Sequence, residues 1–336
     1  MTLLNRAVAV WSGTYAAAGL FWALGGAGYP FAESARARTM GAVLVGLDPT
    51  ATGLVIGLLG LAAAAVALLP RSRVVAGFAW AYGLALVALV PDGRLLLSIG
   101  ELLLLHTDRF EGAAIHQLWA GAGGLLWIAL ALQQRGPRAA PPGRRHPGRR
   151  ITYAAAVLPL LYALPRLVWA AGWPFGLDPA TTVMVSGSTG RVRELVFGLA
   201  VCGGAALTLG LTHRWGEILP RWLPLLGGRR VPSALATIPA GVVAIALIGA
   251  GITIYRALLA ALLSAGSADA AAFDPRNWAA WVGGLIWLPW GLALAAATYA
   301  YHRRRRACGG GVGHPRHHKL PSSHPAPSSY RRSHSA

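Results

Sequence analysis

The chain has 336 residues, of which 55% are hydrophobic and 12% are charged. Soluble domains carry charge on about a quarter of their residues, so this composition excludes a water-soluble globular protein. The net charge of +19 would suggest nucleic-acid binding in a soluble protein. Here the basic residues gather in short segments between apolar runs, and no nucleic-acid-binding motif accompanies them. The sequence therefore predicts an all-α integral membrane protein.

Eight apolar segments are long enough to cross a hydrocarbon core of about 30 Å at about 1.5 Å per residue. They comprise residues 7–26, 51–69, 74–90, 114–133, 151–172, 195–212, 234–255 and 278–301. A further apolar run, RLLLSIGELLLL at 94–105, is too short to span. We expect it to be an outward continuation of the third helix, or an interfacial or re-entrant piece.

The distribution of charge predicts the orientation of the chain. With the N-terminus in the cytoplasm, the inside stretches hold 21 of the 30 lysines and arginines. Ten of the 11 acidic residues then fall outside or at outer helix ends, with Glu217 as the exception. Basic residues concentrate in cytoplasmic loops. We therefore expect a multi-pass protein of a bacterial plasma membrane, with both termini cytoplasmic and anionic lipids as partners at the cytoplasmic face.

Short motifs recur in the same order in the two halves of the chain, which predicts an internal repeat. The pairs are TYAAA at 14–18 and 152–156, FWALG at 21–25 with VWAAG at 168–172, GLDP at 46–49 and 176–179, LVIGL at 54–58 with LVFGL at 195–199, and GGLLW at 123–127 with GGLIW at 283–287. Four spans in each unit would make the two repeats parallel to each other.

This repeat divides the chain into four parts. Residues 1–134 form the first four-helix repeat and residues 151–302 the second. Between them, residues 135–150 read RGPRAAPPGRRHPGRR, a basic and proline-rich linker that can form neither a core nor a span. Residues 303–336 are expected to be a disordered cytoplasmic tail that is basic and rich in His, Ser and Pro.

Three arginines within or next to spans are candidates for substrate binding. Arg166 follows Pro165 inside the fifth segment, and the matched position in the first half is Gly19. A charge inside a span is costly and marks a pathway or binding site by default. The alternative is that Arg166 snorkels to the outer interface or forms a structural ion pair. Arg94 and Arg256 occupy matched positions near the outer interface.

The paired GLDP motifs add two aspartates to these candidates. Asp48 and Asp178 are expected to cap the helices that follow, with proline in the first helical turn. The alternative is that both carboxylates face a shared outer cavity.

The outer loop at 101–116 carries a cluster of polar side chains: Glu101, His106, Asp108, Glu111 and His116. These are ligand types for a divalent metal, but the spacing matches no fixed-geometry metal motif. We expect a solvated loop, with no metal and no cofactor.

The WALGG sequence at 22–26, together with the tandem four-helix layout, resembles uncharacterised actinobacterial multi-pass membrane proteins. The resemblance implies a fold and a compartment. It assigns no activity and no functional residues.

Three functions remain open at this stage. The first is a transporter-like, small-molecule or lipid-handling protein with a site between the repeats, by analogy with carriers built from duplicated bundles. The second is a non-catalytic scaffold that recruits partners or anionic lipid through its basic linker and tail. The third is a membrane-embedded enzyme that uses the outer-loop cluster at the outer leaflet. No oligomeric state follows from the sequence.

Overall fold

The computed structural model of the chain describes residues 2–134, 148–213, 216, 228, 231–263 and 273–309. This part of the chain contains helices and no strand, in agreement with the predicted all-α class. The helices are α1 Leu3–Ala23, α2 Ala35–Met40, α3 Pro49–Leu68, α4 Arg73–Leu89, α5 Gly93–Leu103, η1 Thr107–Arg109, α6 Gly112–Gln134, α7 Arg149–Ala170, α8 Pro179–Ser186, α9 Ser188–Gly210, α10 Ser233–Leu263, η3 Pro275–Asn277, α12 Trp278–Leu285 and α13 Trp287–Gly309. Most of the predicted linker and tail lie outside the described residues, although α13 continues as a helix past the expected start of the tail.

Six helical stretches are long and apolar enough to cross a membrane: α3, α6, α7, α9, α10 and the run Pro275–Arg305, which holds α12 and most of α13. The helices α4 and α5 pass this test together as a pair bent by 56°, which would make a seventh span. Although α1 has 21 residues, it is not among the candidates. It carries Asn5, Arg6, Ser12 and Thr14, which lower its mean hydropathy. The predicted eight spans therefore require that the bent pair and α1 also cross.

The two GLDP motifs adopt the same local structure. Gly46 and Gly176 both have positive φ, 80° and 68°, which glycine accepts without steric cost. The carboxylates of Asp48 and Asp178 each accept a hydrogen bond from a backbone N–H in the first turn of the next helix, at 2.7 Å in both cases. A proline follows at the first helical position in each motif. The predicted caps are present.

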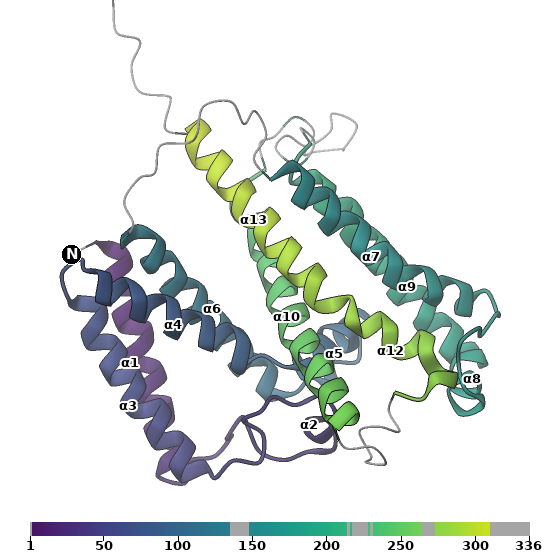
Figure 1. Cartoon of the computed structure of the whole chain (residues 1–336), viewed down its shortest axis with the longest axis horizontal. Helices are drawn as coiled ribbons and strands as arrows, with labels where there is room; N and C mark the ends of the chain where they lie inside the picture. The colour runs from purple at the N-terminus through teal and green to yellow at the C-terminus, as the bar shows by residue number, and fades with distance from the viewer. Residues whose placement is uncertain are drawn as a thin grey trace, which may run out of the picture.

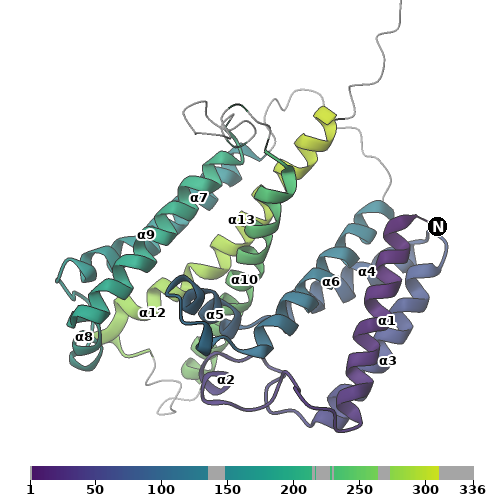
Figure 2. The same cartoon turned by 180° about the vertical axis from the view of Figure 1, so that it is seen from behind.

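The helices form two groups that follow the order of the chain (Figures 1 and 2). In the first group α1 packs along α3 and α4 along α6. In the second, α7 packs along α9 and α10 along α13. Each group has its own buried hydrophobic cluster, with Trp127 at the centre of the first and Tyr301 in the second. Both views show α5 beside α10, within the outline of the second group.

Glycines set the close approach of α1 and α3. A Cβ atom on Gly19 would lie 2.6 Å from the backbone nitrogen of Gly57, and one on Gly53 would lie 2.6 Å from the carbonyl oxygen of Gly19. Helices in membranes gain most of their association energy from such close packing. The α1–α3 contact therefore depends on the absence of side chains at these positions.

The two groups meet where the bent α4–α5 pair touches α10. A Cβ on Gly249 of α10 would lie 2.6 Å from the carbonyl of Pro91, at the break between α4 and α5. Next to this contact, Leu95 of α5 and Ile245 of α10 share a buried cluster with Ala114 and Ala246. The run at 94–105 is thus mainly a separate helix, bent away from its predecessor and packed against α10 of the second group.

Replacing Gly53 by alanine tests the glycine contact. Alanine has the higher helix propensity, by about 1 kcal/mol, so an unhindered glycine-to-alanine change in a helix should stabilise the protein. At Gly53 the new methyl group would overlap the backbone of α1, and we expect a net loss of stability. The measurement is the thermal unfolding midpoint in detergent, followed by tryptophan fluorescence.

Gly13→Ala is the matched control, because no atom lies within 4 Å of a Cβ at that position on α1. It should leave the midpoint unchanged or raise it. Equal effects of the two substitutions would contradict the glycine contact between α1 and α3.

Candidate functional site

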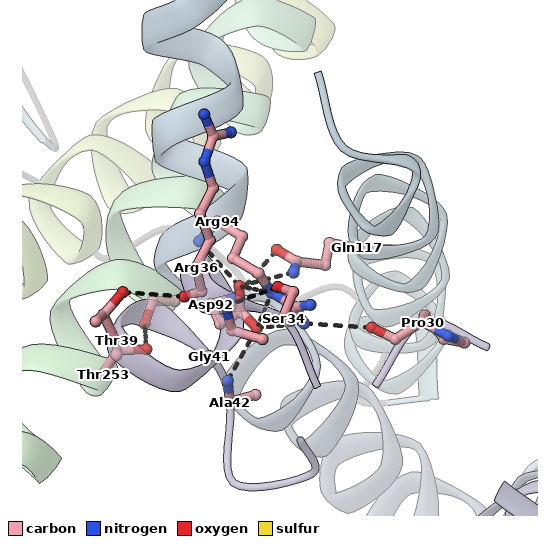
Figure 3. Close-up of polar contacts among 12 residues, drawn as sticks. Pro30, Ser34, Arg36, Thr39, Gly41, Ala42, Asp92, Arg94, Gln117 and Thr253 are labelled. Atoms are coloured by element: carbon pink, nitrogen blue, oxygen red, sulfur yellow. Dashed lines mark hydrogen bonds and ion pairs between the residues drawn. The ribbon is translucent and has the colours of Figure 1, made fainter. Parts of the chain in front are cut away.

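A buried polar network occupies the break between α4 and α5 (Figure 3). The side chain of Asp92 is fully buried. Its carboxylate accepts hydrogen bonds from the backbone N–H of Arg94 at 2.9 Å, from Nε2 of Gln117 at 2.8 Å and from the backbone N–H of Ala42 at 2.9 Å. Asp92 therefore caps α5 and ties it to α6 and to the segment that follows α2.

Arg94 completes this network. Its Nη2 atom lies 2.8 Å from Oδ2 of Asp92 and also donates to the carbonyl of Pro30 at 3.3 Å. The arginine side chain is 3% exposed, so the ion pair is shielded from water. Gln117 closes the arrangement, since its Oε1 accepts the backbone N–H of Asp92 at 3.1 Å. A buried charge is tolerated in this way when it is paired and hydrogen-bonded.

Arg256 reaches the same place from the second group. Its Nη2 atom donates to the carbonyl of Gly41 at 3.2 Å, next to Ala42, which donates to Asp92. Arg256 thus binds the segment 41–42 directly, whereas Arg94 is connected to it through Asp92, the acceptor of the Ala42 N–H (Figure 3). Both helix groups hold this segment, one through Asp92 and the other through Arg256.

The predicted outer-loop cluster divides into two places. Around Arg36 of α2, Glu101 lies 3.2 Å and Glu111 3.8 Å from guanidinium nitrogens. His106 binds the second oxygen of Glu101 at 3.0 Å. Asp108 is exposed in η1. These contacts tie α2 to α5 and to the start of α6, so the carboxylates serve as ion-pair partners.

His116 lies apart from that cluster, inside a box of aromatic rings. It stacks on Tyr15 at a centroid distance of 5.7 Å, and the edges of Trp22 and Phe31 approach it at 5.3 Å each. Its Nε2 atom lies 3.1 Å from the hydroxyl of Tyr15. Its Nδ1 atom is buried and has no hydrogen-bond partner among the described residues. An orphaned buried nitrogen is costly and requires an explanation, such as pairing with a ligand or a water molecule.

An apolar groove of about 340 Å³ opens beside this histidine, between α1 and α6. It is lined by Tyr15, Ala18, Trp22, Gly112, Ile115, His116 and Trp119. The next residue along α6, Gln117, belongs to the Asp92 network. The groove and the network are therefore neighbours, an apolar surface beside a polar one.

Arg166 forms an ion pair inside the second group. Its Nη1 atom lies 2.5 Å from Oε2 of Glu194 on α9, whose side chain is 3% exposed. The guanidinium also lies over the rings of Tyr162 at 4.4 Å, Phe197 at 5.8 Å and Trp169 at 5.9 Å. Phe197 touches Gly100 of α5. Arg166 thus lies in the second group, and Phe197 separates it from α5 at the junction.

The structure does not gather the five predicted substrate-binding residues into one site. Arg94 and Arg256 meet at the junction, Arg166 lies in the second group, and Asp48 and Asp178 cap separate helices. No group of three or more His, Cys, Asp or Glu side chains suited to a metal ion occurs within the described residues.

Several residues of these sites are not recognisable from their own sequence context. Asp92 and Glu194 are read from the sequence as acids of an outer loop or helix end, whereas both are buried. Gln117 is a lone amide in an apolar run, and Arg36 lies in the short helix α2, between two of the predicted spans. The one signal for Asp92 is the sequence Pro91-Asp92-Gly93, a breaker inside an apolar stretch.

Comparisons with protein-family models, with curated proteins and with solved structures find no match for this chain.

Replacing Asp92 by alanine should destabilise the protein by about 3–5 kcal/mol, because Arg94 would be left as an uncompensated buried charge. The amides of Ala42 and Gln117 would lose their acceptor as well. The measurement is chemical unfolding of the detergent-solubilised protein, followed by tryptophan fluorescence.

Asp274→Ala is the matched control, because Asp274 pairs with Arg276, two residues later in the chain, as Asp92 pairs with Arg94. Asp274 lies at the surface, where hydrogen bonds from the side chain and backbone of Arg276 lower the pKa of its carboxyl. Surface pairs contribute little to stability, so no measurable loss is expected. An Asp92→Ala protein as stable as the Asp274→Ala protein would refute the role given to the network.

Proposed function

We propose that this chain is a lipid-handling, transporter-like membrane protein whose ligand site lies at the junction between its two helix groups. The observation that carries the proposal is the broken α4–α5 span. Discontinuous spans form the substrate sites of many carriers built from repeats, where the free helix ends provide polar backbone groups. Here the break holds the buried ion pair of Asp92 and Arg94, and ionisable residues buried within an apolar span are candidates for function by default.

Contacts between matched residues support two repeats. The match of residues 21–25 with 168–172, extended backwards, places Leu20 opposite Leu167, and the LVIGL match places Gly57 opposite Gly198. A Cβ on Gly57 would lie 2.7 Å from Cδ2 of Leu20, and one on Gly198 would lie 2.6 Å from Cδ2 of Leu167. The same pair of positions is in contact in both groups.

The buried faces of α1 and α7 support the same alignment and disagree with the TYAAA match. With this offset, buried positions of α1 fall on buried positions of α7: Val8 on Ala155, Ser12 on Pro159, Ala16 on Ala163 and Trp22 on Trp169. The TYAAA match would place Tyr15 opposite Tyr153 instead. Tyr153 is 36% exposed and Tyr15 is 3% exposed. The two offsets, 147 and 138, differ by nine residues. Nine residues are about two and a half helical turns, so the TYAAA match pairs residues on opposite faces of the two helices.

The apolar groove beside the network favours a lipid as ligand. A hydrocarbon chain fits a groove lined by aromatic and aliphatic side chains, and a polar head fits the neighbouring region around His116 and Arg94. An amphipathic ligand is the chemical class that uses both. Glu101 and Glu111 are already paired with Arg36, and Asp108 is exposed apart from them, so the enzyme hypothesis is not carried further.

The topology belongs to the proposal. Eight spans, formed by α1, α3, the bent α4–α5 pair, α6, α7, α9, α10 and the α12–α13 run, would place both termini on one side. The excess of basic residues in the inside stretches favours the cytoplasmic side of a bacterial plasma membrane.

Lipid movement in reconstituted vesicles tests this function. The protein is placed in phosphatidylcholine–phosphatidylglycerol vesicles that contain an acyl-labelled fluorescent phosphatidylglycerol, and dithionite is added to quench the outer leaflet. We expect label from the inner leaflet to become accessible. Trp119→Ala, which removes an exposed ring from the groove, should slow this movement by about fivefold or more.

Leu125→Ala is the matched control, since Leu125 and Trp119 lie on the same helix and are each 47% exposed. Leu125 is not part of the groove. Its replacement should leave the rate unchanged. Vesicles in which the inner-leaflet label stays protected, although the protein is folded and inserted, would exclude lipid movement as the function.

A further inference from the structure

The two positions of the ion pair Arg166–Glu194 are occupied by glycines at the matched places in the first group. The repeat alignment places Gly19 opposite Arg166, and the LVIGL match places Gly53 opposite Glu194. In the first group these positions are the glycines of the close α1–α3 contact, where a Cβ on Gly19 would lie 2.8 Å from the carbonyl of Gly53. In the second group the same two positions hold a salt bridge.

Packing of the helix pair therefore does not require these charges. Burying two ions costs several kcal/mol in desolvation, which a close ion pair only partly recovers. The first group joins its two helices at the same place without that cost. A charged pair that the architecture can do without, inside an apolar segment, is better explained by binding than by folding.

The charges around Glu194 are also unbalanced. Its Oε2 atom accepts from Arg166 and its Oε1 atom from Arg193, at 3.2 Å. One carboxylate is thus shared by two guanidinium groups, leaving an excess of one positive charge. The rings around Arg166 stabilise a cation without cancelling its charge. A third arginine, Arg191, lies nearby with its guanidinium 3.3 Å from a Cβ position on Gly172, at the end of α7.

The hydrogen bonding of Arg166 is incomplete. Its Nε atom is buried and has no hydrogen-bond partner among the described residues. The side chain as a whole keeps 19% exposure, so part of it is accessible from outside.

We infer that Arg166, Arg193 and Glu194 form a binding site for a phosphate-type anion, separate from the junction site and independent of the function proposed above. The guanidinium groups bind the anion oxygens, as arginines do with phosphates. Glu194 holds the two arginines in place and competes with the anion for them. The anion is either a free phosphate or the headgroup of an anionic phospholipid, and both present the same chemistry.

Substitutions of the two ion-pair partners should change anion affinity in opposite directions. Arg166→Gln removes a charge-assisted contact and should weaken phosphate binding by at least about tenfold. Glu194→Gln removes the competing carboxylate and should strengthen binding, by up to about tenfold. A purely structural ion pair predicts instead that both variants lose stability and that neither alters anion binding.

The measurement is the thermal unfolding midpoint of the detergent-purified chain against inorganic phosphate, at ionic strength held constant with chloride. A saturable rise in the midpoint gives the apparent affinity. A parallel series in micelles compares phosphatidylglycerol with phosphatidylcholine. Stabilisation by phosphate supports the site and a free anion, and stabilisation by phosphatidylglycerol alone supports the site and a lipid headgroup.

Arg276→Gln and Asp274→Asn are the matched controls. They make the same charge changes in an ion pair at the same end of the second group, where Asn277 contacts Thr181 of α8. Neither should alter anion affinity. The inference is overturned if neither phosphate nor phosphatidylglycerol stabilises the wild-type chain, or if the Arg166 and Glu194 variants bind both anions as the wild type does.

Discussion

The carboxylate of Asp92 is the contact on which the arrangement of the two helix groups depends. A span that breaks at Pro91 exposes backbone N–H groups in an apolar setting, and such groups must find partners inside the protein. Asp92 supplies the acceptor for the start of α5, binds Arg94 and Gln117, and fixes Ala42. Because the break is stabilised in this way, α5 can leave the axis of α4 and pack on α10, which itself packs against Pro91. The bend and the junction are consequences of one polar interaction.

The helix pairs α1–α3 and α7–α9 solve the same packing problem with different chemistry. Glycines bring α1 and α3 into backbone contact, and a Gly–Leu contact recurs at the matched positions of α7 and α9. In the repeat alignment that we propose, Gly19 and Gly53 of the first pair correspond to Arg166 and Glu194 of the second. A glycine contact provides close packing and nothing else, whereas an ion pair provides charge at a cost in desolvation. The chemical difference between the groups is therefore concentrated at this level of the helices.

Local rules account for the parts of the structure that the sequence predicts. The GLDP motifs predict a left-handed glycine, an aspartate cap and a proline at the helix start, and all three depend on neighbouring residues alone. The run at 94–105 is too short to span, and it forms a separate bent helix. The network and the histidine box could not be predicted, because Asp92, Ala42 and Gln117 are brought together by tertiary packing. For the same reason His116 is separated from Glu101 and His106: it follows the face of α6 that packs on α1.

Buried polar groups in this structure differ in whether all their hydrogen-bonding atoms have partners. Those with an atom left unpaired are the candidates for binding a ligand. Both oxygens of Asp92 accept hydrogen bonds from within the protein, so this carboxylate has no free acceptor position for a ligand. His116 and Arg166 each keep one buried nitrogen without a partner among the described residues. His116 contacts the rings of Tyr15 and Trp22 on α1, and Arg166 contacts the rings of Tyr162 and Trp169 on α7. The proposed repeat offset pairs Tyr15 with Tyr162 and Trp22 with Trp169. An unpaired buried donor or acceptor gains free energy when a ligand pairs with it. The two unpaired nitrogens are therefore the groups to which our two proposals assign a ligand, His116 beside the apolar groove and Arg166 in a cationic cluster.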